Sequence, residues 1–311
     1  MLERCQPDKL INADKITEEE WLKWRKMGLG GSDIAAILGL SPWASPLTIY
    51  EDKTGGVILE DDDVFDNCAM EVGKELEDYL ARKFQKWLCA HEGHNVTIER
   101  DPWIYQHPMV PWALGSLDGV FTHPEKGRTG LELKTTNEFR KNDWEDDDLP
   151  EGYYIQVQWY MFVAGLEHFY IAYLIGNRKF GAKYIPRNDD VIRVLFEEAE
   201  EFWQKYVQTR TPPEPIGLPK ETDLLKELHG EEEPGKVVEL HDMEETRNRY
   251  KEVMAEIKGL ESEKRKLQQQ FMAAMGDAEL AWIGDKKVTW KTQHRKGYTV
   301  EPSSSRVMRI G

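Results

Sequence analysis

Hydrophobic and polar residues alternate in a short segment near the middle of the chain. In residues 130–136 two leucines alternate with Glu132 and Lys134. Because successive side chains of a β-strand point to opposite faces, Glu132 and Lys134 share one face of the predicted strand. Residues 115–121 form a second hydrophobic run, and Gly, Pro and Lys residues separate the two runs. This pattern predicts a β-hairpin with a carboxylate and an ammonium group on one face.

The spacing of hydrophobic residues predicts further elements on both sides of this hairpin. Thr17 and Glu20 have the spacing of a capping box, which predicts the start of a helix that carries Trp21 and Arg25. The other predicted helices are residues 34–38, 47–53, 64–87, 153–164 and 189–208, and the other predicted strands are residues 95–100, 103–106, 112–121, 168–175 and 180–185. This mixture predicts an α/β or α+β domain.

The last third of the chain has a different pattern. Between residues 243 and 275 hydrophobic residues recur at intervals of three and four, with Lys264 at one of these positions. The pattern predicts a coiled coil or a helical hairpin. Self-association, an intramolecular hairpin and docking of a recombination partner all stay open as roles for this arm.

The proline-rich residues 211–215 end the first part of the chain. We therefore expect two domains, residues 1–218 and residues 219–311. A second β-hairpin is expected over residues 281–291, and its Trp282 and Trp290 either stack on bases or anchor a small sheet.

The composition is that of a globular protein of 311 residues, 40% of them hydrophobic and 32% charged. No hydrophobic run approaches the length of a membrane span, and the N-terminus lacks the hydrophobic core of a signal peptide. The three cysteines are widely spaced and form no CxxC pair, which indicates a reducing compartment. We therefore expect a cytoplasmic protein without a membrane partner.

The net charge of −16 argues against tight static binding of nucleic acid, because phosphate contacts come from Lys and Arg. Much of the negative charge lies in three short acidic runs, residues 60–63, 145–148 and 231–233, which are typical of solvated loops. A local basic groove or a metal site remains compatible with DNA binding.

The predicted hairpin carries candidate chemistry. Asp118 lies on the strand next to Glu132 and Lys134, so two carboxylates and one lysine come together. Mg²⁺ prefers hard oxygen ligands, and a bound metal lowers the pKa of its water. A lysine beside such a water steers it or stabilises the developing negative charge. The alternative interpretation is an ordinary amphipathic hairpin with an exposed Glu/Lys pair.

A third carboxylate is expected from the long helix that precedes the hairpin. Glu77 shares one helical face with Gly73, Leu80 and Phe84. Glu75 is the competing candidate, but it lies about 200° from Glu77 around the helix axis. The alternative for Glu77 is a glutamate at the edge of the hydrophobic stripe.

The order of these features resembles the YqaJ family of phage-type exonucleases, which are relatives of phage lambda exonuclease and of alkaline exonucleases. The resemblance rests on Gly-Gly-Ser after a first helix, a long helix with Glu, a strand Asp, a strand Glu-x-Lys, and a helix with Gln-x-Gln; it covers roughly residues 21–203. It implies a PD-(D/E)XK, restriction-endonuclease-like core with a central mixed sheet flanked by helices. A C-terminal helical arm and a small β-hairpin would be appended to it.

The resemblance also implies roles for individual residues. The metal ligands would be the side chains of Asp118, Glu132 and Glu77 and the backbone carbonyl of Leu133. Lys134 would be the catalytic lysine, and Gln156 would hold the scissile phosphate or the water. Arg25 and Ser32 match a pair that binds a 5′-terminal phosphate in the family; the alternatives are a surface Arg25 packed on Trp21 and a simple N-cap at Ser32.

The expected function is a Mg²⁺-dependent DNA exonuclease that resects linear duplex ends from 5′ to 3′ for single-strand-annealing recombination. Two Mg²⁺ ions per site are expected, and Mn²⁺ as a substitute. The family implies a homo-oligomer, with a ring-like trimer favoured, a single-strand annealing protein as partner, and a phage or prophage protein in a bacterial host. The alternatives are a structure- or sequence-specific endonuclease and a non-catalytic recombination scaffold.

Overall fold

A computed structural model describes residues 4–56, 68–144, 149–294 and 308, apart from the side chains of Ala69 and Met70. The chain divides into two compact units, residues 1–228 and residues 229–311. The acidic runs at 60–63 and 145–148 and the first residues of the predicted 64–87 helix lie outside the described residues.

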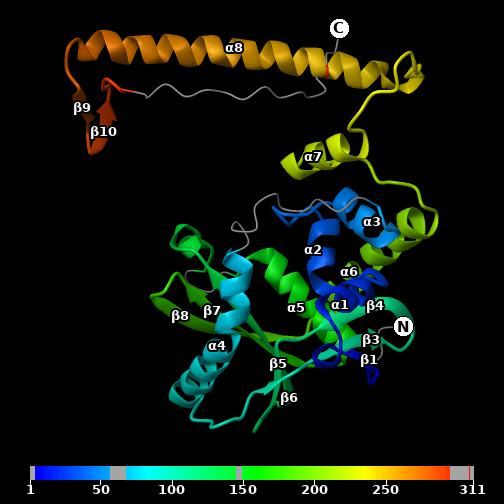
Figure 1. Ribbon diagram of the computed structural model, residues 1–311. Helices are drawn as coiled ribbons and strands as arrows, with labels where there is room; N and C mark the ends of the chain where they lie inside the picture. Colours follow the sequence, from blue (N-terminus) through cyan, green and yellow to red (C-terminus); the bar gives the residue numbers. More distant parts are fainter. Residues whose placement is uncertain (1–3, 57–67, 145–148, 295–307, 309–311) are drawn as a thin grey trace. The chain divides into compact units, whose positions relative to one another are not determined.

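The first unit contains two sheets (Figure 1). The larger has the strand order β2 (Glu99–Arg100), β5 (Gly119–His123), β6 (Gly127–Thr136), β7 (His168–Ile175) and β8 (Lys179–Pro186). Its β6–β7 pair is parallel and the other pairs are antiparallel, so the sheet is mixed. The smaller sheet consists of β1 (Asp8–Asn12), β3 (Trp103–His107) and β4 (Val110–Ser116).

Helices surround these sheets, which confirms the expected mixed sheet flanked by helices (Figure 1). The α-helices of the first unit are α1 (Glu18–Lys26), α2 (Gly31–Ile37), α3 (Pro46–Thr54), α4 (Cys68–Glu92), α5 (Glu151–Ala164), α6 (Asp189–Phe202) and α7 (Pro219–Leu228). Short 3₁₀ segments span Ala13–Lys15 and Glu138–Trp144, and a π-helical segment, Trp203–Gln208, continues α6.

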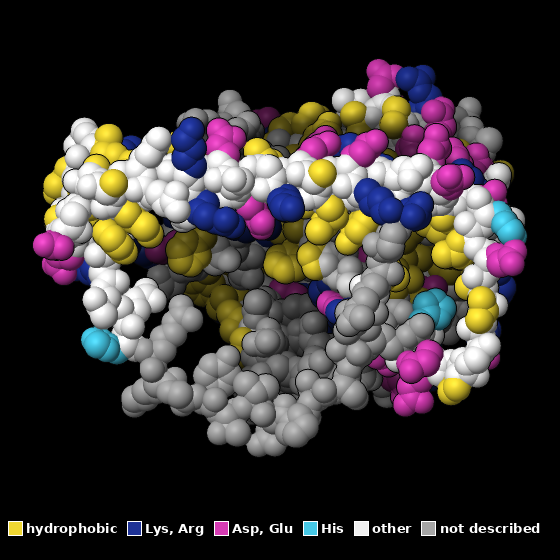
Figure 2. Space-filling model, turned by 90° about the horizontal axis from the view of Figure 1, so that it is seen from above, with side chains coloured by type: hydrophobic (Ala, Val, Ile, Leu, Met, Phe, Trp, Pro, Cys, Tyr) yellow, Lys and Arg dark blue, Asp and Glu magenta, His cyan; other side chains and the backbone are white. Residues whose placement is uncertain are grey.

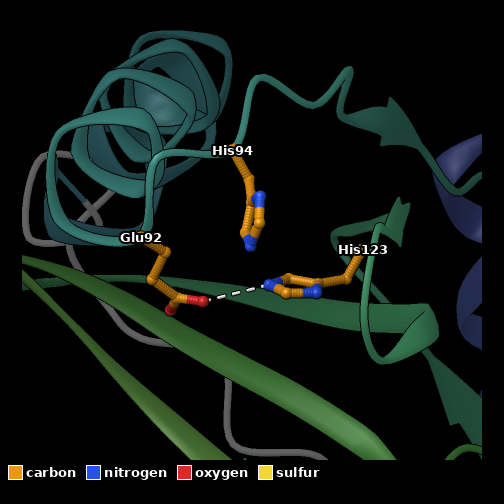
Figure 3. Close-up of side chains that lie close together, drawn as sticks. All are labelled: Glu92, His94 and His123. Atoms are coloured by element: carbon orange, nitrogen blue, oxygen red, sulfur yellow. Dashed lines mark hydrogen bonds and ion pairs between the residues drawn. The ribbon is translucent and has the colours of Figure 1, made fainter.

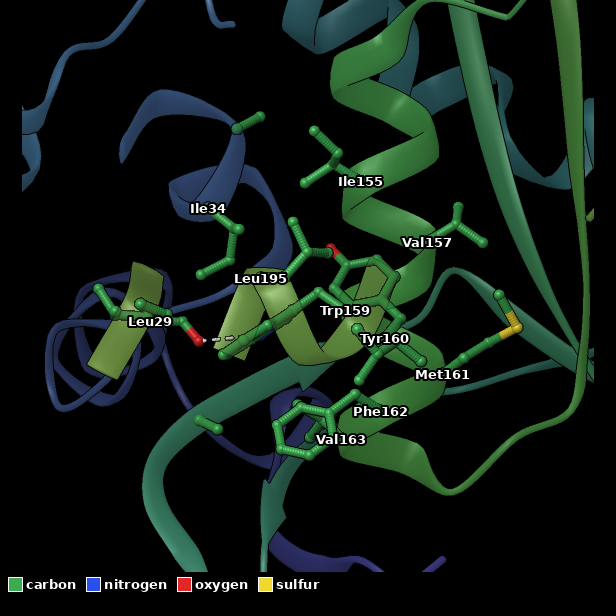
Figure 4. Packing of buried hydrophobic residues seen from close by; sticks show 14 of the residues in the cluster. Leu29, Ile34, Ile155, Val157, Trp159, Tyr160, Met161, Phe162, Val163 and Leu195 are labelled. Atoms are coloured by element: carbon green, nitrogen blue, oxygen red, sulfur yellow. Dashed lines mark hydrogen bonds between the residues drawn. The ribbon is translucent and has the colours of Figure 1, made fainter. Parts of the chain in front are cut away.

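The central strand β7 is buried on both faces. Phe169 and Ile171 belong to the main hydrophobic core. This core also contains the hydrophobic side chains of α5 (Figure 4). Tyr170 points to the other face and packs in a second cluster with Phe84 and Leu88 of α4. Alternation along one strand therefore places α5 on one face of the sheet and α4 on the other.

Trp159 of α5 connects the core to the segment that precedes α2. Its indole Nε1 donates a hydrogen bond to the carbonyl oxygen of Leu29 at 3.2 Å (Figure 4) and another to that of Leu114 at 3.0 Å. Leu29 also forms a β-bridge with Ala113 of β4. These contacts fix the position of the glycine turn between α1 and α2 relative to α5.

The strand predicted over residues 112–121 is wrong in one respect, because it divides into β4 and β5 of different sheets. The break lies at Leu117 and Asp118, where the Asp118 carboxylate accepts a hydrogen bond from the backbone N–H of Leu133 at 2.7 Å. The strand β1 and the helix α7 had no counterpart among the predicted elements.

The second unit consists of α8 (Glu244–Met275), a short 3₁₀ turn before it (His241–Met243), and the antiparallel pair β9 (Leu280–Ile283) and β10 (Lys286–Thr289). Because α8 is one continuous helix of 32 residues, the helical-hairpin alternative is wrong. Hydrophobic side chains along α8, among them Tyr250, Ile257 and Leu260, are exposed between charged residues (Figure 2). The predicted boundary at 218/219 falls just before α7, which packs with α3 in the first unit.

Within the described residues, no helix has the length and hydropathy that a membrane crossing requires.

Candidate active site

A cavity of about 580 Å³ lies beside the end of β6. Its lining includes five of the residues singled out from the sequence, namely Arg25, Ser32, Asp118, Lys134 and Gln156. The cavity thus joins the catalytic candidates to the proposed phosphate-binding pair, although these residues come from α1, α2, the β4–β5 bend, β6 and α5.

Glu132 lies at the centre of a hydrogen-bond network behind the cavity wall. Its Oε1 accepts from the Lys134 ammonium at 2.5 Å and from Gln156 Nε2 at 2.9 Å. Its Oε2 is buried and has no hydrogen-bond partner among the described residues. A buried carboxylate oxygen without a donor is costly unless a cation contacts it, so this atom marks a position where a metal ion fits.

Asp118 is placed by the register of the sheet. Strand β5 begins at Gly119 opposite Leu131, so β6 has no β5 partner beyond that point. The Asp118 carboxylate takes the open N–H of Leu133 instead. In an extended strand the N–H and C=O of one residue point to the same edge, so the Leu133 carbonyl faces the side where Asp118 lies. This arrangement fits the predicted use of that carbonyl as a metal ligand.

Glu77 approaches from α4 and is partly buried, whereas Glu75 is exposed. The buried side chains of Leu80 and Phe84 share the face of Glu77, as the helical period predicts. Burial and the nearby charge of Asp118 raise the pKa of Glu77, which places this carboxyl group within electrostatic range of the other two.

The three carboxyl groups give the site a negative electrostatic potential. Burial, together with the charge of Asp118, raises the pKa of Glu132 to about 7 although Lys134 opposes the shift. Burial also raises the pKa of Asp118, against the opposing charges of Lys134 and Arg100. The charge of Asp118 thus raises the pKa of both Glu132 and Glu77, and a divalent cation would offset this repulsion.

Lys134 remains the cation of this group. Burial alone would lower its pKa, but the charges of Glu132 and Asp118 outweigh burial and raise the pKa. The ammonium also lies 5.0 Å from the centre of the Tyr153 ring. Lys134 is therefore held as a protonated donor and is unsuited to act as a general base at neutral pH.

Arg25 and Ser32 are brought together as the spacing suggested. The Arg25 guanidinium donates to Ser32 Oγ at 3.2 Å and lies 4.9 Å from the centre of the Trp21 ring. The capping box of α1 at Thr17 and Glu20 is present. Ser32 is not an N-cap, because α2 starts at Gly31 and its N-cap residue is Gly30. The backbone N–H of Gly30 donates to the carboxylate of Asp33.

Two glycines allow close approaches beside this pair, Gly31 to α5 and Gly28 to β4. A Cβ on Gly31 would lie 2.8 Å from the backbone oxygen of Gln156 and 2.9 Å from a ring carbon of Tyr160. A Cβ on Gly28 would lie 2.3 Å from the backbone oxygen of Trp112. Only glycine permits this close packing of α2 on α5, which sets the distance between Ser32 and Gln156.

Comparisons with known proteins show the family of this chain. A model of the YqaJ-like viral recombinase domain matches residues 20–167. The protein YqaJ of Bacillus subtilis strain 168 is 33% identical over 285 residues, which cover 91% of this chain and 86% of the relative. The chain belongs to the YqaJ family. Every candidate site residue lies inside the segment that matches the YqaJ-like domain.

Among solved structures, an alkaline exonuclease from Laribacter hongkongensis is 18% identical and superposes with a TM-score of 0.47; the match covers 68% of this chain and 98% of that one. A phage-related exonuclease from Haemophilus somnus 129PT is 14% identical with a TM-score of 0.42, covering 59% and 95%.

One residue beside the candidate site of this YqaJ-family chain was not singled out from the sequence. The Tyr160 hydroxyl accepts from Gln156 Nε2 at 2.9 Å, and burial raises the pKa of Tyr160. It follows Gln156 by four residues, so a helix places both on one face. The hydrophobic surroundings of α5 concealed this signal, because Tyr160 has the pattern of an ordinary core residue.

A second group of ligand-type side chains, Glu92, His94 and His123, lies elsewhere on the YqaJ-family domain (Figure 3). His123 Nδ1 accepts two backbone N–H groups, at 3.1 and 3.2 Å, so its proton lies on Nε2, which contacts Glu92 at 3.0 Å. The Lys126 ammonium lies 3.1 Å from both Glu92 and His123 Nε2. This pattern fits a network around the Lys126–Glu92 ion pair better than a metal site. A metal ion would need the lone pair of His123 Nε2, which carries the proton, and would have to occupy the position of the Lys126 ammonium.

Proposed function

We propose that this YqaJ-family protein is a divalent-metal-dependent DNA exonuclease that degrades linear duplex DNA from its 5′ ends. The observation that carries the proposal is the buried Glu132 Oε2 without a donor among the described residues, next to Asp118 and beside a protonated Lys134. Membership in a family of viral recombinase domains supports a nuclease over other uses of such a site.

The donor set fits Mg²⁺. Asp118, Glu132 and Glu77 offer carboxylate oxygens and Leu133 offers a carbonyl, which are the hard ligands that Mg²⁺ prefers, and Mn²⁺ would substitute. We propose two ions per site, with Asp118 shared between them. When bound, such ions lower the pKa of water and neutralise charge on the phosphate.

The other side chains have roles that follow from their contacts. Lys134 is held protonated, so its ammonium can donate a hydrogen bond to a phosphate oxygen and stabilise the negative charge that develops there. Gln156 donates both N–H groups of its amide nitrogen, to Glu132 and to Tyr160, which leaves its amide oxygen free to accept a hydrogen bond from the attacking water. Tyr160 holds the Gln156 amide in this orientation.

The end preference is proposed to arise from Arg25 and Ser32. A guanidinium binds a terminal phosphate through two parallel hydrogen bonds, and Trp21 supports its plane from one side. Because this pair and Lys134 line one cavity, a 5′-phosphate bound there lies near the metal ligands. That geometry favours resection with 5′-to-3′ polarity.

The test is digestion of linear duplex DNA that carries either a 5′-phosphate or a 5′-hydroxyl, with a covalently closed circle in parallel and with Mg²⁺ or EDTA. We expect Mg²⁺-dependent loss of the linear 5′-phosphorylated duplex and an intact circle. Nicking of the circle would indicate an endonuclease on the same core. Loss of neither DNA would indicate a non-catalytic scaffold.

We further propose that the protein is a homo-oligomer, with a ring-like trimer favoured, and works with a single-strand annealing protein in the cytoplasm of a bacterial host that carries a phage or prophage. The exposed hydrophobic side chains of α8 support an assembly. A ring that gathers a few Lys and Arg residues around DNA would reconcile the net charge of −16 with DNA binding. Light scattering of the full chain measures the number of subunits in the oligomer. The same measurement on a chain that ends at residue 228 tests whether the C-terminal arm is needed for assembly.

A further inference from the structure

Lys53 is a buried lysine that the mechanism above does not use. Its side chain is 1% exposed and lies on α3. The ammonium contacts the backbone carbonyl of Arg25 at 3.2 Å, Asp33 at 2.9 Å and Asp52 at 3.0 Å. Three partners match the three hydrogens of an ammonium group, so Lys53 ties together α1, α2 and α3.

Asp33 links this lysine to the proposed phosphate pocket. Its Oδ2 accepts from Lys53 and from the backbone N–H of Gly30 at 2.9 Å. Its Oδ1 lies 4.0 Å from the Arg25 guanidinium. Burial would raise the pKa of Asp33, but the charges of Lys53 and Arg25 outweigh burial and lower it, so the carboxyl group is ionised.

Two cations therefore share one buried carboxylate. Arg25 keeps its guanidinium on the cavity wall, bonded to Ser32, because Lys53 already satisfies one oxygen of Asp33. Without Lys53, Asp33 would be a buried charge whose nearest remaining side-chain cation at this site is Arg25. A buried unpaired carboxylate is strongly unfavourable, so the guanidinium would turn toward it and form a bidentate pair.

We propose that Lys53 is a positioning residue for 5′-phosphate recognition: it neutralises Asp33 and thereby keeps the Arg25 guanidinium available for the terminal phosphate. This inference rests on the proposed phosphate pocket of Arg25 and Ser32. It assigns to Lys53 an effect on the ligand that is transmitted through Asp33 and Arg25, without contact between Lys53 and DNA.

The test compares kcat/KM on linear duplex DNA with a 5′-phosphate and with a 5′-hydroxyl, using the full chain with Mg²⁺. In Lys53→Met we expect the phosphate preference to fall about ten- to hundredfold, mainly through KM, as for loss of a charge-assisted hydrogen bond. The double variant Lys53→Met/Asp33→Asn removes both charges and should restore the preference, because the oxygen of the introduced amide still accepts the N–H of Gly30. The matched control is Lys26→Met, which removes a partner of Asp52 without touching Asp33 and should leave the preference unchanged.

Several outcomes would overturn the inference. An equal loss on both DNA ends in Lys53→Met, or no recovery in the double variant, would show a purely structural role. If Lys53→Met does not fold, Asp33→Asn alone still decides, because the inference requires it to retain the preference and a loss there contradicts it. If the wild-type protein has no preference for a 5′-phosphate, or if Arg25→Ala keeps it, the proposed pocket itself is wrong.

Discussion

Replacing Glu132 by Gln removes the carboxyl group whose ionisation the fold opposes most directly. In the folded protein the pKa of Glu132 is raised to about 7, from an ordinary value of 4.5. The folded state therefore holds this proton more tightly than the unfolded state. The resulting stabilisation is fully present below pH 4.5 and is lost as the pH rises through about 7.

The size of the effect follows from the same two values. At about 1.36 kcal/mol per pH unit, the difference between 4.5 and about 7 corresponds to about 3 kcal/mol in the free energy of unfolding. For a domain of this size that is roughly 6–12 °C in the melting temperature. The Gln variant cannot ionise, so between about pH 5 and about pH 8 the wild type should lose most of this stability relative to the variant.

Thermal unfolding at pH 5 and pH 8, with and without Mg²⁺, measures the effect. We expect Mg²⁺ to stabilise the wild type more at pH 8, where the carboxylates are ionised, than at pH 5, and to stabilise Glu132→Gln little at either pH. Parallel pH profiles of the two proteins without metal would refute the raised pKa. Equal stabilisation by Mg²⁺ at both pH values would refute the placement of the metal at Glu132.

Three further predictions test the site. Lys134→Ala should keep DNA binding, measured by fluorescence anisotropy, and lose cleavage by about 100- to 1,000-fold; retained cleavage contradicts its role. Glu77→Gln should lose Mg²⁺-dependent cleavage whereas the matched Glu75→Gln should not, and the reverse result would exchange the two assignments. Gly31→Ala should lower the free energy of unfolding in a denaturant titration by about 1–3 kcal/mol, because its Cβ would meet the backbone oxygen of Gln156 at 2.8 Å; an unchanged midpoint contradicts this packing.

Elements with a strong local pattern, either a run of aromatic and branched residues or a regular hydrophobic spacing, were predictable from the sequence. The strand predicted at residues 168–175 and the helix predicted at 243–275 match β7 and α8 within a residue. The alternation around Glu132 also predicted that it shares a face with Lys134, and their 2.5 Å contact agrees. In these cases the period of the local element determines which way the side chains point, without help from distant residues.

Features that depend on distant partners were not predictable in the same way. The hydrophobic run over residues 112–121 gives no sign of the break at Asp118, because that break depends on the N–H of Leu133. The strand β1 exists through its pairing with β3. Likewise, no local pattern joins Lys53 to Asp33 or to the carbonyl of Arg25, since helix packing brings these groups together.

The acidic chain and its proposed DNA substrate are compatible if bound metal ions make the charge at the active-site cavity positive. Without a cation, the raised pKa values of Glu132, Asp118 and Glu77 describe a site that repels phosphate. Divalent ions would reverse that sign, and Lys134 and Arg25 would then add to it from the same cavity. Because the chain as a whole is negatively charged, this cavity would then attract DNA more than the average surface does. A net charge of −16 would then restrict where DNA binds without preventing its binding.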